Sequence, residues 1–246
     1  MTKFINIDYG FGSRRAVFAP LLGNGIFTQE GLSWKHSREL LRKQFVRAQY
    51  QNLDHFREHM DNLITCMPAD GDVDLQPLFF KLTLDTATAL LFGRSVYSLR
   101  ANIDQDTENK EFAECFNLAQ EGLAKRFRLA PFHFVYNPAP FRKACQKVHL
   151  FVERYIKERL EGDKGSQGDT SWFFDQLAEE SPSRTDLRDQ LLNVLLAGRD
   201  TTACCLSWTL YVSLGSPGTK SYLFTLLAVY LLAIRPPWSA FVRRSL

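Results

Sequence analysis

Apolar residues recur at helical spacing along most of the chain after residue 30. Between about Gly31 and Ala48, for example, Trp34, Leu41 and Phe45 fall on one helix face. The same criterion predicts further helices at about residues 52–66, 75–92, 110–128, 141–160, 172–179 and 184–211. We find no alternation of apolar and polar residues that favours a β-strand. The pattern therefore predicts a mainly α fold.

Glycine and proline mark the segments that interrupt this pattern. Gly93 follows the predicted helix at 75–92 and suits a C-terminal stop, because glycine adopts the left-handed conformation without strain. The composition of residues 161–170 predicts a flexible surface loop. Residues 1–29 are punctuated by glycines and by Pro20, and are predicted to be irregular.

The helix predicted at 184–211 is the longest. The sequence from Ser183 to Asp186 fits a capping box, which places its start. About 28 residues at 1.5 Å each make it roughly 42 Å long, enough to cross a domain. Apolar residues surround its axis, so we expect a buried central helix.

Residues 197–202, in the middle of this helix, are poorly suited to a helix interior. Gly198 costs about 1 kcal/mol relative to alanine, and threonine hydroxyls compete for the carbonyl four residues earlier. A buried aspartate such as Asp200 needs a partner. A functional interpretation is that Gly198 leaves room for a ligand and that Asp200 relays protons, with Thr201 bonded to the Ala197 carbonyl. The alternative is a glycine-kinked core helix whose charged residues face solvent.

Trp34 and Arg38 form a second candidate site. They lie four residues apart, so one helix face would present an indole N–H and a guanidinium together. This pair suits a ligand that carries a carboxylate, because arginine binds carboxylates through two parallel hydrogen bonds. The alternative is a surface cation–π pair.

Composition and charge narrow the function classes. The chain has 246 residues, 45% of them hydrophobic, and a net charge of +3, which excludes disordered and collagen-like classes and gives no reason to expect nucleic-acid binding. The cations after residue 211, at positions 220, 235, 243 and 244, have no acidic residue among them, so the whole positive excess lies in this tail. Five scattered cysteines indicate a reducing compartment, and no spacing of ligand residues predicts a metal site.

Several motifs, taken in order, resemble those of the cytochrome P-450 family of haem-thiolate monooxygenases. Residues 197–202 resemble the oxygen-activation motif on the family's long I helix, and Trp34-x-x-x-Arg38 resembles its C-helix motif. The similarity is closer still to the fungal branch that hydroxylates n-alkanes and fatty acids at the chain end. Five segments carry it: LGNGIF (22–27), WKHSR (34–38), LDTAT (84–88), LFG (91–93) and QLLNVLLA (190–197).

This resemblance implies an incomplete cytochrome P-450 fold, from about the C helix to the I helix, and a role for each candidate residue. Trp34 and Arg38 would bind a haem propionate. Ala197 and Gly198 would let the I helix lie over the haem. Asp200 and Thr201 would be the catalytic pair, delivering protons during oxygen activation.

The resemblance also implies cofactors, partners and a location. The parent enzyme would use haem and would insert one oxygen atom of O2 into a hydrophobic alkane or fatty acid. Its electrons would come from NADPH through a cytochrome P-450 reductase. The family works at the endoplasmic reticulum membrane, but this sequence shows no counterpart of the family's membrane anchor.

The cysteine loop that binds the haem iron in this family, Phe-x-x-Gly-x-Arg-x-Cys-x-Gly, is absent from the sequence. Cys204 and Cys205 lie one turn past Thr201, on the wrong side of the haem, and cannot replace it. We therefore expect an inactive fragment, whose I helix exposes apolar surface. The alternative is a non-enzymatic helical remnant that binds hydrophobic ligands or partner proteins.

Residues 212–246 do not continue the family pattern. Val212-Ser213 can be encoded GTG-AGT, which is how many introns begin. We predict a partial cytochrome P-450 domain at residues 1–211 and a tail at 212–246 that is a translated intron or a frameshift product.

Overall fold

The computed structural model describes residue 10 and residues 12–48, 54–68, 70–100, 107–161 and 172–215. These residues form eight α-helices and two short 3-10 helices. The elements in chain order are α1 (Arg14–Leu22), α2 (Gly31–Ala48), α3 (Asp54–Thr65), α4 (Leu75–Phe92), η1 (Ser98–Arg100), α5 (Thr107–Arg128), η2 (His133–Val135), α6 (Ala139–Glu161), α7 (Trp172–Glu180) and α8 (Arg184–Gly215). The prediction of a mainly α fold is confirmed.

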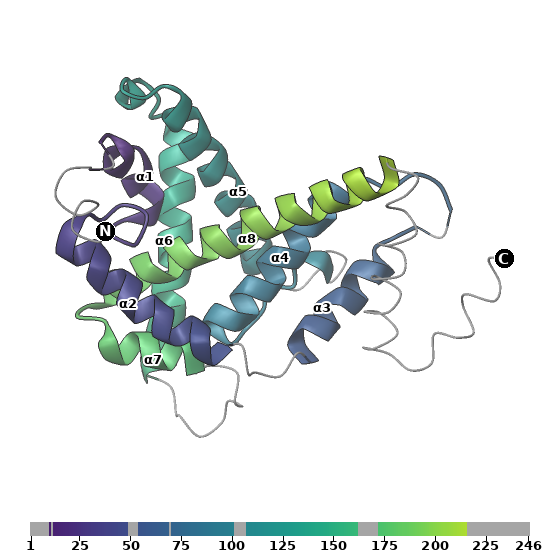
Figure 1. The fold of residues 1–246 in the computed structure, drawn as a ribbon, viewed down its shortest axis with the longest axis horizontal. Helices are drawn as coiled ribbons and strands as arrows, with labels where there is room; N and C mark the ends of the chain where they lie inside the picture. The colour runs from purple at the N-terminus through teal and green to yellow at the C-terminus, as the bar shows by residue number, and fades with distance from the viewer. Residues whose placement is uncertain are drawn as a thin grey trace.

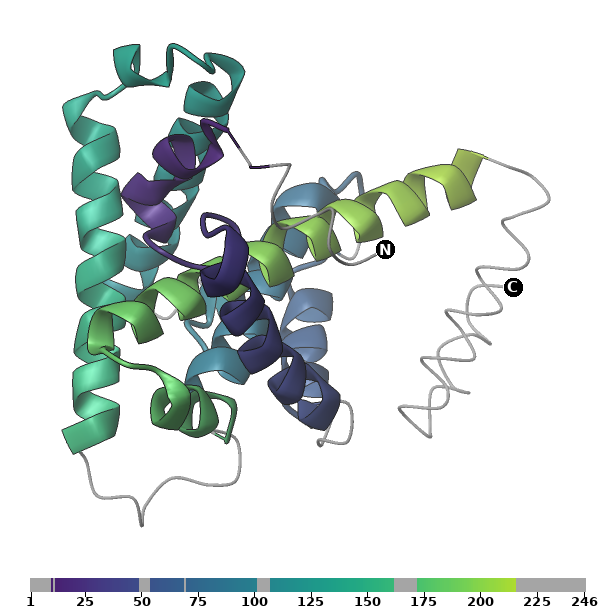
Figure 2. The same ribbon diagram turned by 60° about the vertical axis from the view of Figure 1, so that its left-hand side comes forward.

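The long helix α8 runs across the molecule, and the other helices are arranged around it (Figure 1). It crosses α4 closely and also contacts α1, α6 and α7. The α5 and α6 helices lie side by side and run in opposite directions, joined through η2 (Figure 2). This arrangement places parts of α1, α5 and α8 close to one another.

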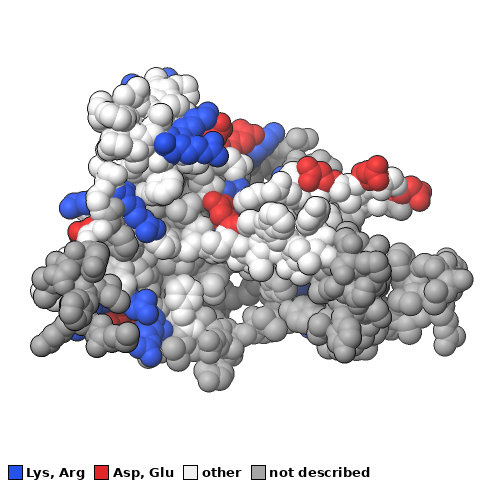
Figure 3. Space-filling view, turned by 45° about the horizontal axis from the view of Figure 1, so that its top comes forward, with Lys and Arg blue, Asp and Glu red and all other residues white. Residues whose placement is uncertain are grey.

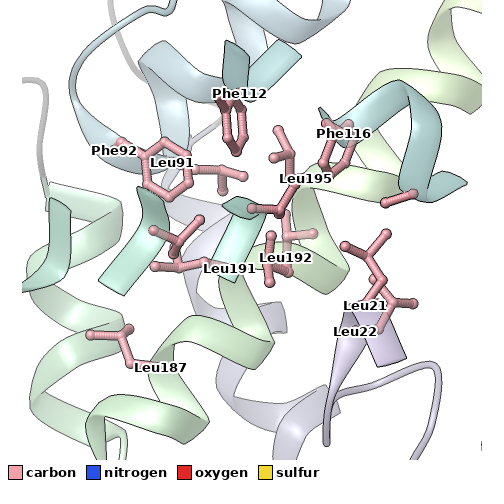
Figure 4. Close-up of a cluster of buried hydrophobic side chains, with 14 of the residues drawn as sticks. Leu21, Leu22, Leu91, Phe92, Phe112, Phe116, Leu187, Leu191, Leu192 and Leu195 are labelled. Atoms are coloured by element: carbon pink, nitrogen blue, oxygen red, sulfur yellow. The ribbon is translucent and has the colours of Figure 1, made fainter. Parts of the chain in front are cut away.

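The main core forms where α8 meets its neighbours. Leu191, Leu192 and Leu195 of α8 are fully buried. Figure 4 shows these leucines among buried side chains of α1, α4 and α5, namely Leu21, Leu22, Leu91, Phe92, Phe112 and Phe116. Burying one leucine side chain contributes roughly 1.5–3 kcal/mol, so this cluster anchors the N-terminal half of α8.

Local signals placed several helix ends correctly. The Ser183 hydroxyl accepts the Asp186 backbone N–H at 3.1 Å, as the predicted capping box requires. Gly93 follows α4 with a φ of 70° in the left-handed region, as expected for a C-terminal stop. The helices therefore begin and end within a few residues of their predicted bounds.

The prediction that residues 1–29 are irregular is wrong for residues 14–22, because α1 forms there despite Pro20. Proline lacks an N–H group, so the carbonyl of Ala16 loses its usual helical donor. The buried Arg126 of α5 donates to that oxygen at 2.9 Å and to the oxygen of Val17 at 3.1 Å. A guanidinium from a distant helix thus satisfies the carbonyl that Pro20 leaves without a helical donor.

The C-terminal part of α8 also differs from the prediction. The helix continues through residues 212–215, past the predicted end at residue 211. Near this end of the helix, Trp208 is 61% exposed, Tyr211 70% and Val212 56%. The expected burial therefore holds mainly for the N-terminal half, although Ala203 in the C-terminal half is fully buried, and the expected exposure of apolar surface is present. Residues 216–246 of the predicted tail lie outside the described residues.

No helix among the described residues is both long enough and apolar enough to cross a membrane.

Candidate functional site

Residues 197–202 lie in the middle of α8 and remain helical throughout. The Thr201 hydroxyl donates to the Ala197 carbonyl oxygen at 2.7 Å, as the sequence predicts. Thr201 is exposed, and Ala197 is half-buried. The two residues therefore occupy an open side of the helix rather than its packed side.

Gly198 lies on the same open stretch of α8. A Cβ atom built at Gly198 meets only the Ala87 Cβ of α4, at an ordinary contact distance of 3.8 Å. The residues described around Gly198 thus leave space beside the helix. The approach of a flat ligand to this glycine stays a prediction.

The alternative of a simple kinked helix requires both Arg199 and Asp200 to face solvent. The structure does not place both of them there. Arg199 is only 5% exposed. It donates to Asn117 and Gln120 of α5 and, at 3.1 Å, to Oδ1 of Asp200. Its guanidinium also lies over the ring of Phe80, 5.0 Å from the ring centre. The arginine is therefore an internal tie between α8, α5 and α4.

Asp200 is half-buried and held from two sides. Its Oδ2 accepts a hydrogen bond from Nε2 of Gln120 at 2.7 Å, while its Oδ1 faces Arg199. Burial raises the pKa of Asp200 above its ordinary value of 3.8, and the Arg199 charge and the Gln120 hydrogen bond oppose that rise. A carboxyl group with a raised pKa is better suited to exchange protons near neutral pH than a fully solvated one.

An apolar pocket of about 340 Å³ opens beside this segment, between α1, α5 and α8. Leu196, Ala197, Asp200 and Thr201 form its α8 wall. The remaining lining residues are mostly apolar: Arg14, Phe18, Leu22, Phe27, Gln120, Leu123, Ala124 and Phe127. Such a lining suits a small hydrophobic molecule.

The surface outside this pocket carries charge in small groups. On the face in Figure 3, acidic and basic side chains lie next to one another in several small groups, with uncharged surface between the groups. A wider concavity of about 840 Å³ lies between α5 and α6, where Lys147 pairs with Glu111 and Arg154 pairs with Glu108. Its charged lining contains none of the predicted site residues, so the smaller pocket is the better candidate.

Trp34 and Arg38 lie together on α2, away from the pocket lining. The Arg38 guanidinium carbon is 5.4 Å from the Trp34 ring centre, and Arg38 is exposed. Between them, Ser37 is buried and accepts a hydrogen bond from Gln190 of α8 at 2.6 Å. The Trp34–Arg38 pair thus has the geometry of the surface cation–π alternative, on a helix that is tied to the N-terminal half of α8, and its binding of a carboxylate stays a prediction.

Two further polar residues of α8 hold the segment before α2. Asp189 accepts the Asn24 backbone N–H at 2.7 Å. Asn193 accepts the Phe27 N–H at 3.0 Å and donates to the Leu22 carbonyl at 2.9 Å. These contacts span more than 160 positions of the chain, and the sequence analysis did not identify them. Their only local signal is a polar residue inside an apolar helix.

Several residues of α8 and α2 have the chemistry that a haem requires, and the cysteines of α6 and α8 lie in different environments. Open space at Gly198 and the Trp34–Arg38 pair suit a flat macrocycle with carboxylate side chains. Cys145 is buried, which raises the pKa of its thiol to about 12, and Cys204 and Cys205 are exposed on α8 beyond Thr201. Within the described ranges, no group of three or more His, Cys, Asp or Glu side chains could hold a metal ion.

Sequence and structure comparisons match most of this chain to known proteins of one family. A family model described as Cytochrome P450 matches residues 6–223. A Cytochrome P450 of Arthroderma benhamiae is 43% identical over 207 residues, which cover 82% of this chain and 41% of that protein. Cytochrome P450 52A13 of Debaryomyces hansenii is 44% identical over 217 residues, which cover 83% of this chain and 42% of that protein.

The chain therefore spans about two fifths of the length of these curated relatives. A solved structure, the cytochrome P450DA heme domain, superposes with a TM-score of 0.71 at 20% identity, covering 88% of this chain and 48% of that one. This likeness shows a shared fold and confirms the prediction of a partial fold of this type. The matched range of the family model also extends past residue 211, where the sequence predicts the family pattern to stop.

Proposed function

The chain belongs to the cytochrome P450 family, and from that membership we propose that it supplies the substrate and proton-delivery side of a haem-thiolate monooxygenase acting on alkanes or fatty acids. The observation that carries the proposal is the position of Asp200 and Thr201. Both residues line an apolar pocket of about 340 Å³, and Asp200 is tied to a buried arginine. Proton-handling groups thus lie beside a space that suits an alkyl chain.

The haem would be held by residues on two helices. Arg38, with Trp34 beside it, would bind a propionate through charge-assisted hydrogen bonds. Gly198 would allow close approach of the macrocycle, since only Ala87 lies near its missing Cβ. When bound, a haem with a thiolate ligand supplies the chemistry that transfers an oxygen atom to a C–H bond.

The chain's own residues would then hold and deliver protons and would exclude water from the substrate. The Thr201 hydroxyl, oriented by its bond to Ala197, would present its oxygen to the reacting side of the pocket. Asp200 would hold a proton for it, because burial favours the neutral carboxyl group. The phenylalanine and leucine side chains of α1 and α5 would exclude water from the alkyl chain.

Electrons would come from NADPH through a cytochrome P450 reductase, and the complete protein would work at the endoplasmic reticulum membrane. The 246 residues contain no cysteine in the family's loop motif, so we further propose that this chain alone forms no thiolate-ligated haem and is inactive. The experiment is a haem titration of the purified chain, followed by absorbance with and without reduction and CO. A band of thiolate-ligated haem would contradict this part of the proposal.

The exposed apolar end of α8 favours a second candidate function. Trp208, Tyr211 and Val212 are each more than half exposed and could dock a hydrophobic partner or ligand without any catalysis. The same titration separates the two functions. A stoichiometric haem band of non-thiolate type supports the monooxygenase assignment, whereas no haem binding at all supports a non-enzymatic helical remnant.

A further inference from the structure

Gln190 of α8 forms a buried hydrogen bond with a side chain of α2. Its Nε2 atom donates to Oγ of Ser37 at 2.6 Å, across 153 positions of the chain. Gln190 is 5% exposed and Ser37 only 1%, so little water competes for the bond. Oε1 of Gln190 has no hydrogen-bond partner among the described residues, so the bond to Ser37 is what fixes the amide group.

Ser37 passes the connection on to the segment that enters α2. Its Oγ atom donates in turn to Oε1 of Gln29 at 2.5 Å. Gln29 comes shortly before Gly31, the first residue of α2. Gln190, Ser37 and Gln29 thus form a chain of hydrogen bonds, which holds the start of α2 and also the rotation of this helix about its own axis.

The rotation of α2 decides where Trp34 and Arg38 point. Arg38 follows Ser37 directly, which is about 100° around the helix, and Trp34 precedes Ser37 by less than one turn. Ser37 faces α8, whereas Arg38 is exposed, with its guanidinium carbon 5.4 Å from the centre of the Trp34 ring. Since Ser37 is held against α8, the Trp34–Arg38 pair keeps one direction relative to α8.

Gln190 lies on the side of α8 that leads to the open stretch at Gly198. The helix makes about two turns, or about 10 Å, between Gln190 and Ala197, so these two residues lie on one side of α8. Ala197 lines the apolar pocket, and Gly198 follows it with open space beside it. The bond to Ser37 therefore sets the distance between the two places where the proposed haem would be held.

We propose that Gln190 is a positioning residue, which holds the Trp34–Arg38 pair where it binds the carboxylates of a haem that lies beside Gly198. The inference rests on the proposed function and deepens it, because Gln190 acts here through Ser37 and not on the haem itself. An arginine binds a carboxylate through directed hydrogen bonds, so the strength of binding depends on where the guanidinium points. An α2 helix that is free to rotate loses part of that binding energy to the ordering of the helix.

The test compares haem with its dimethyl ester, in which both carboxylates are blocked. Binding of each compound to the full 246-residue chain is followed by absorbance titration. We expect the wild type to bind haem at least about tenfold more tightly than the ester. In Gln190→Met and in Ser37→Ala this preference should fall about threefold or more, while the affinity for the ester stays unchanged. Ser37→Thr keeps the hydroxyl group and should retain the preference.

A double mutant separates positioning from a general loosening of the fold. Arg38→Gln removes the guanidinium and should abolish the preference for haem over the ester. Gln190→Met should then have no further effect on that preference, because both residues act through one contact. Gln44→Met is the matched control, since Gln44 is a buried glutamine on the same helix as Ser37 and has no hydrogen-bond partner within the described ranges.

The outcomes distinguish this role from the proposed function. An unchanged preference in Gln190→Met or in Ser37→Ala, the same fall in Gln44→Met, or a further fall when Gln190→Met is added to Arg38→Gln overturns the positioning role and leaves the proposed function standing. If Gln190→Met does not fold, Ser37→Ala decides. A wild type that binds haem and the ester equally overturns the carboxylate role of Arg38 and this inference with it. A wild type that binds neither compound overturns both this inference and the proposed function.

Discussion

Gln120 of α5 donates a hydrogen bond from Nε2 to Oδ2 of Asp200 on α8 over 2.7 Å. Its Oε1 atom accepts from Arg199 at the same time, so one amide group joins both charges in the middle of α8. Gln120 also lines the apolar pocket together with Leu123 of the same helix. The environment of the Asp200 carboxyl group therefore depends on the position of α5.

Replacing Gln120 with leucine is expected to raise the pKa of Asp200 further. The hydrogen bond stabilises the charged carboxylate, and its removal leaves the effect of burial less opposed. The pKa is measured by NMR of carboxyl carbons in 13C-aspartate-labelled protein. Leu118→Ala, an exposed position of α5, is the control. An unchanged or lower pKa of Asp200 in Gln120→Leu would show that the amide does not stabilise the carboxylate.

Protonation of His149 is expected to weaken folding under mildly acidic conditions. His149 of α6 is largely buried, its Nε2 lies 2.7 Å from the Leu21 carbonyl oxygen, and burial lowers its pKa below the ordinary value of 6.5. The unfolded chain then binds this proton at a higher pH than the folded chain does. The contribution of neutral His149 is thus present above pH 6.5 and is lost as the pH falls below it.

The measurement is the free energy of urea unfolding on both sides of this pH. His149→Gln keeps a donor for Leu21 without a titrating ring, so it should lose less stability on acidification than the wild type does. Asp85 and Asp200, whose pKa values are raised by burial, act in the opposite sense at lower pH in both proteins. His36→Gln, at an exposed position, is the control and should keep the wild-type loss. An equal loss in His149→Gln would refute the assignment.

Gly23 is expected to tolerate alanine much less well than Gly12 does. Both glycines have a positive φ, 56° and 57°, and Gly23 combines it with a ψ of −133°, a conformation that glycine adopts far more readily than alanine. At Gly23 a Cβ would also lie 2.0 Å from a carboxylate oxygen of Asp189, which accepts the Asn24 N–H. At Gly12 nothing lies within 4 Å.

We expect Gly12→Ala to cost at most about 1 kcal/mol of unfolding free energy and Gly23→Ala more than about 2 kcal/mol. Urea denaturation of both variants provides the comparison. Equal losses would mean that the contact with Asp189 does not constrain the segment before α2.

The helices were predictable because their signal is local. The 3.6-residue spacing of apolar side chains, the helix stop at Gly93 and the helix start at Ser183 depend only on neighbouring residues. The α1 helix was missed because Pro20 is tolerated there through Arg126, which is more than 100 positions away and bonds the Ala16 carbonyl. No feature of the sequence near Pro20 indicates that contact.

Within the candidate site, too, contacts between near neighbours in the sequence were predictable and long-range contacts were not. The bond from Thr201 to Ala197 follows from their four-residue spacing on one helix, and it was predicted. Gln120 was not, because its contact with Asp200 spans 80 positions and depends on how α5 packs on α8. The position of Arg14 beside the pocket likewise depends on how α1 packs, and the local sequence predicts irregular chain there.

Catalysis by Thr201 can be tested in a chimera in which residues 14–211 replace the matching segment of Debaryomyces hansenii cytochrome P450 52A13. Thr201→Val removes the hydroxyl group but keeps the shape of the side chain. Product formation with dodecanoate is expected to fall at least about tenfold, since a positioned proton donor contributes about 10²–10⁴-fold to rate. The neighbouring exposed Thr202→Val is the control. Equal losses of product formation in the two variants would contradict a catalytic role of Thr201.

The reduced-CO absorbance spectrum of the unmutated chimera tests the central claim most directly. If residues 14–211 form the substrate and proton-delivery side of a cytochrome P450, the chimera binds one haem per chain. It then gives the same thiolate-haem band as the unaltered Debaryomyces hansenii protein. A chimera that is monomeric and helical yet binds no haem would contradict the claim.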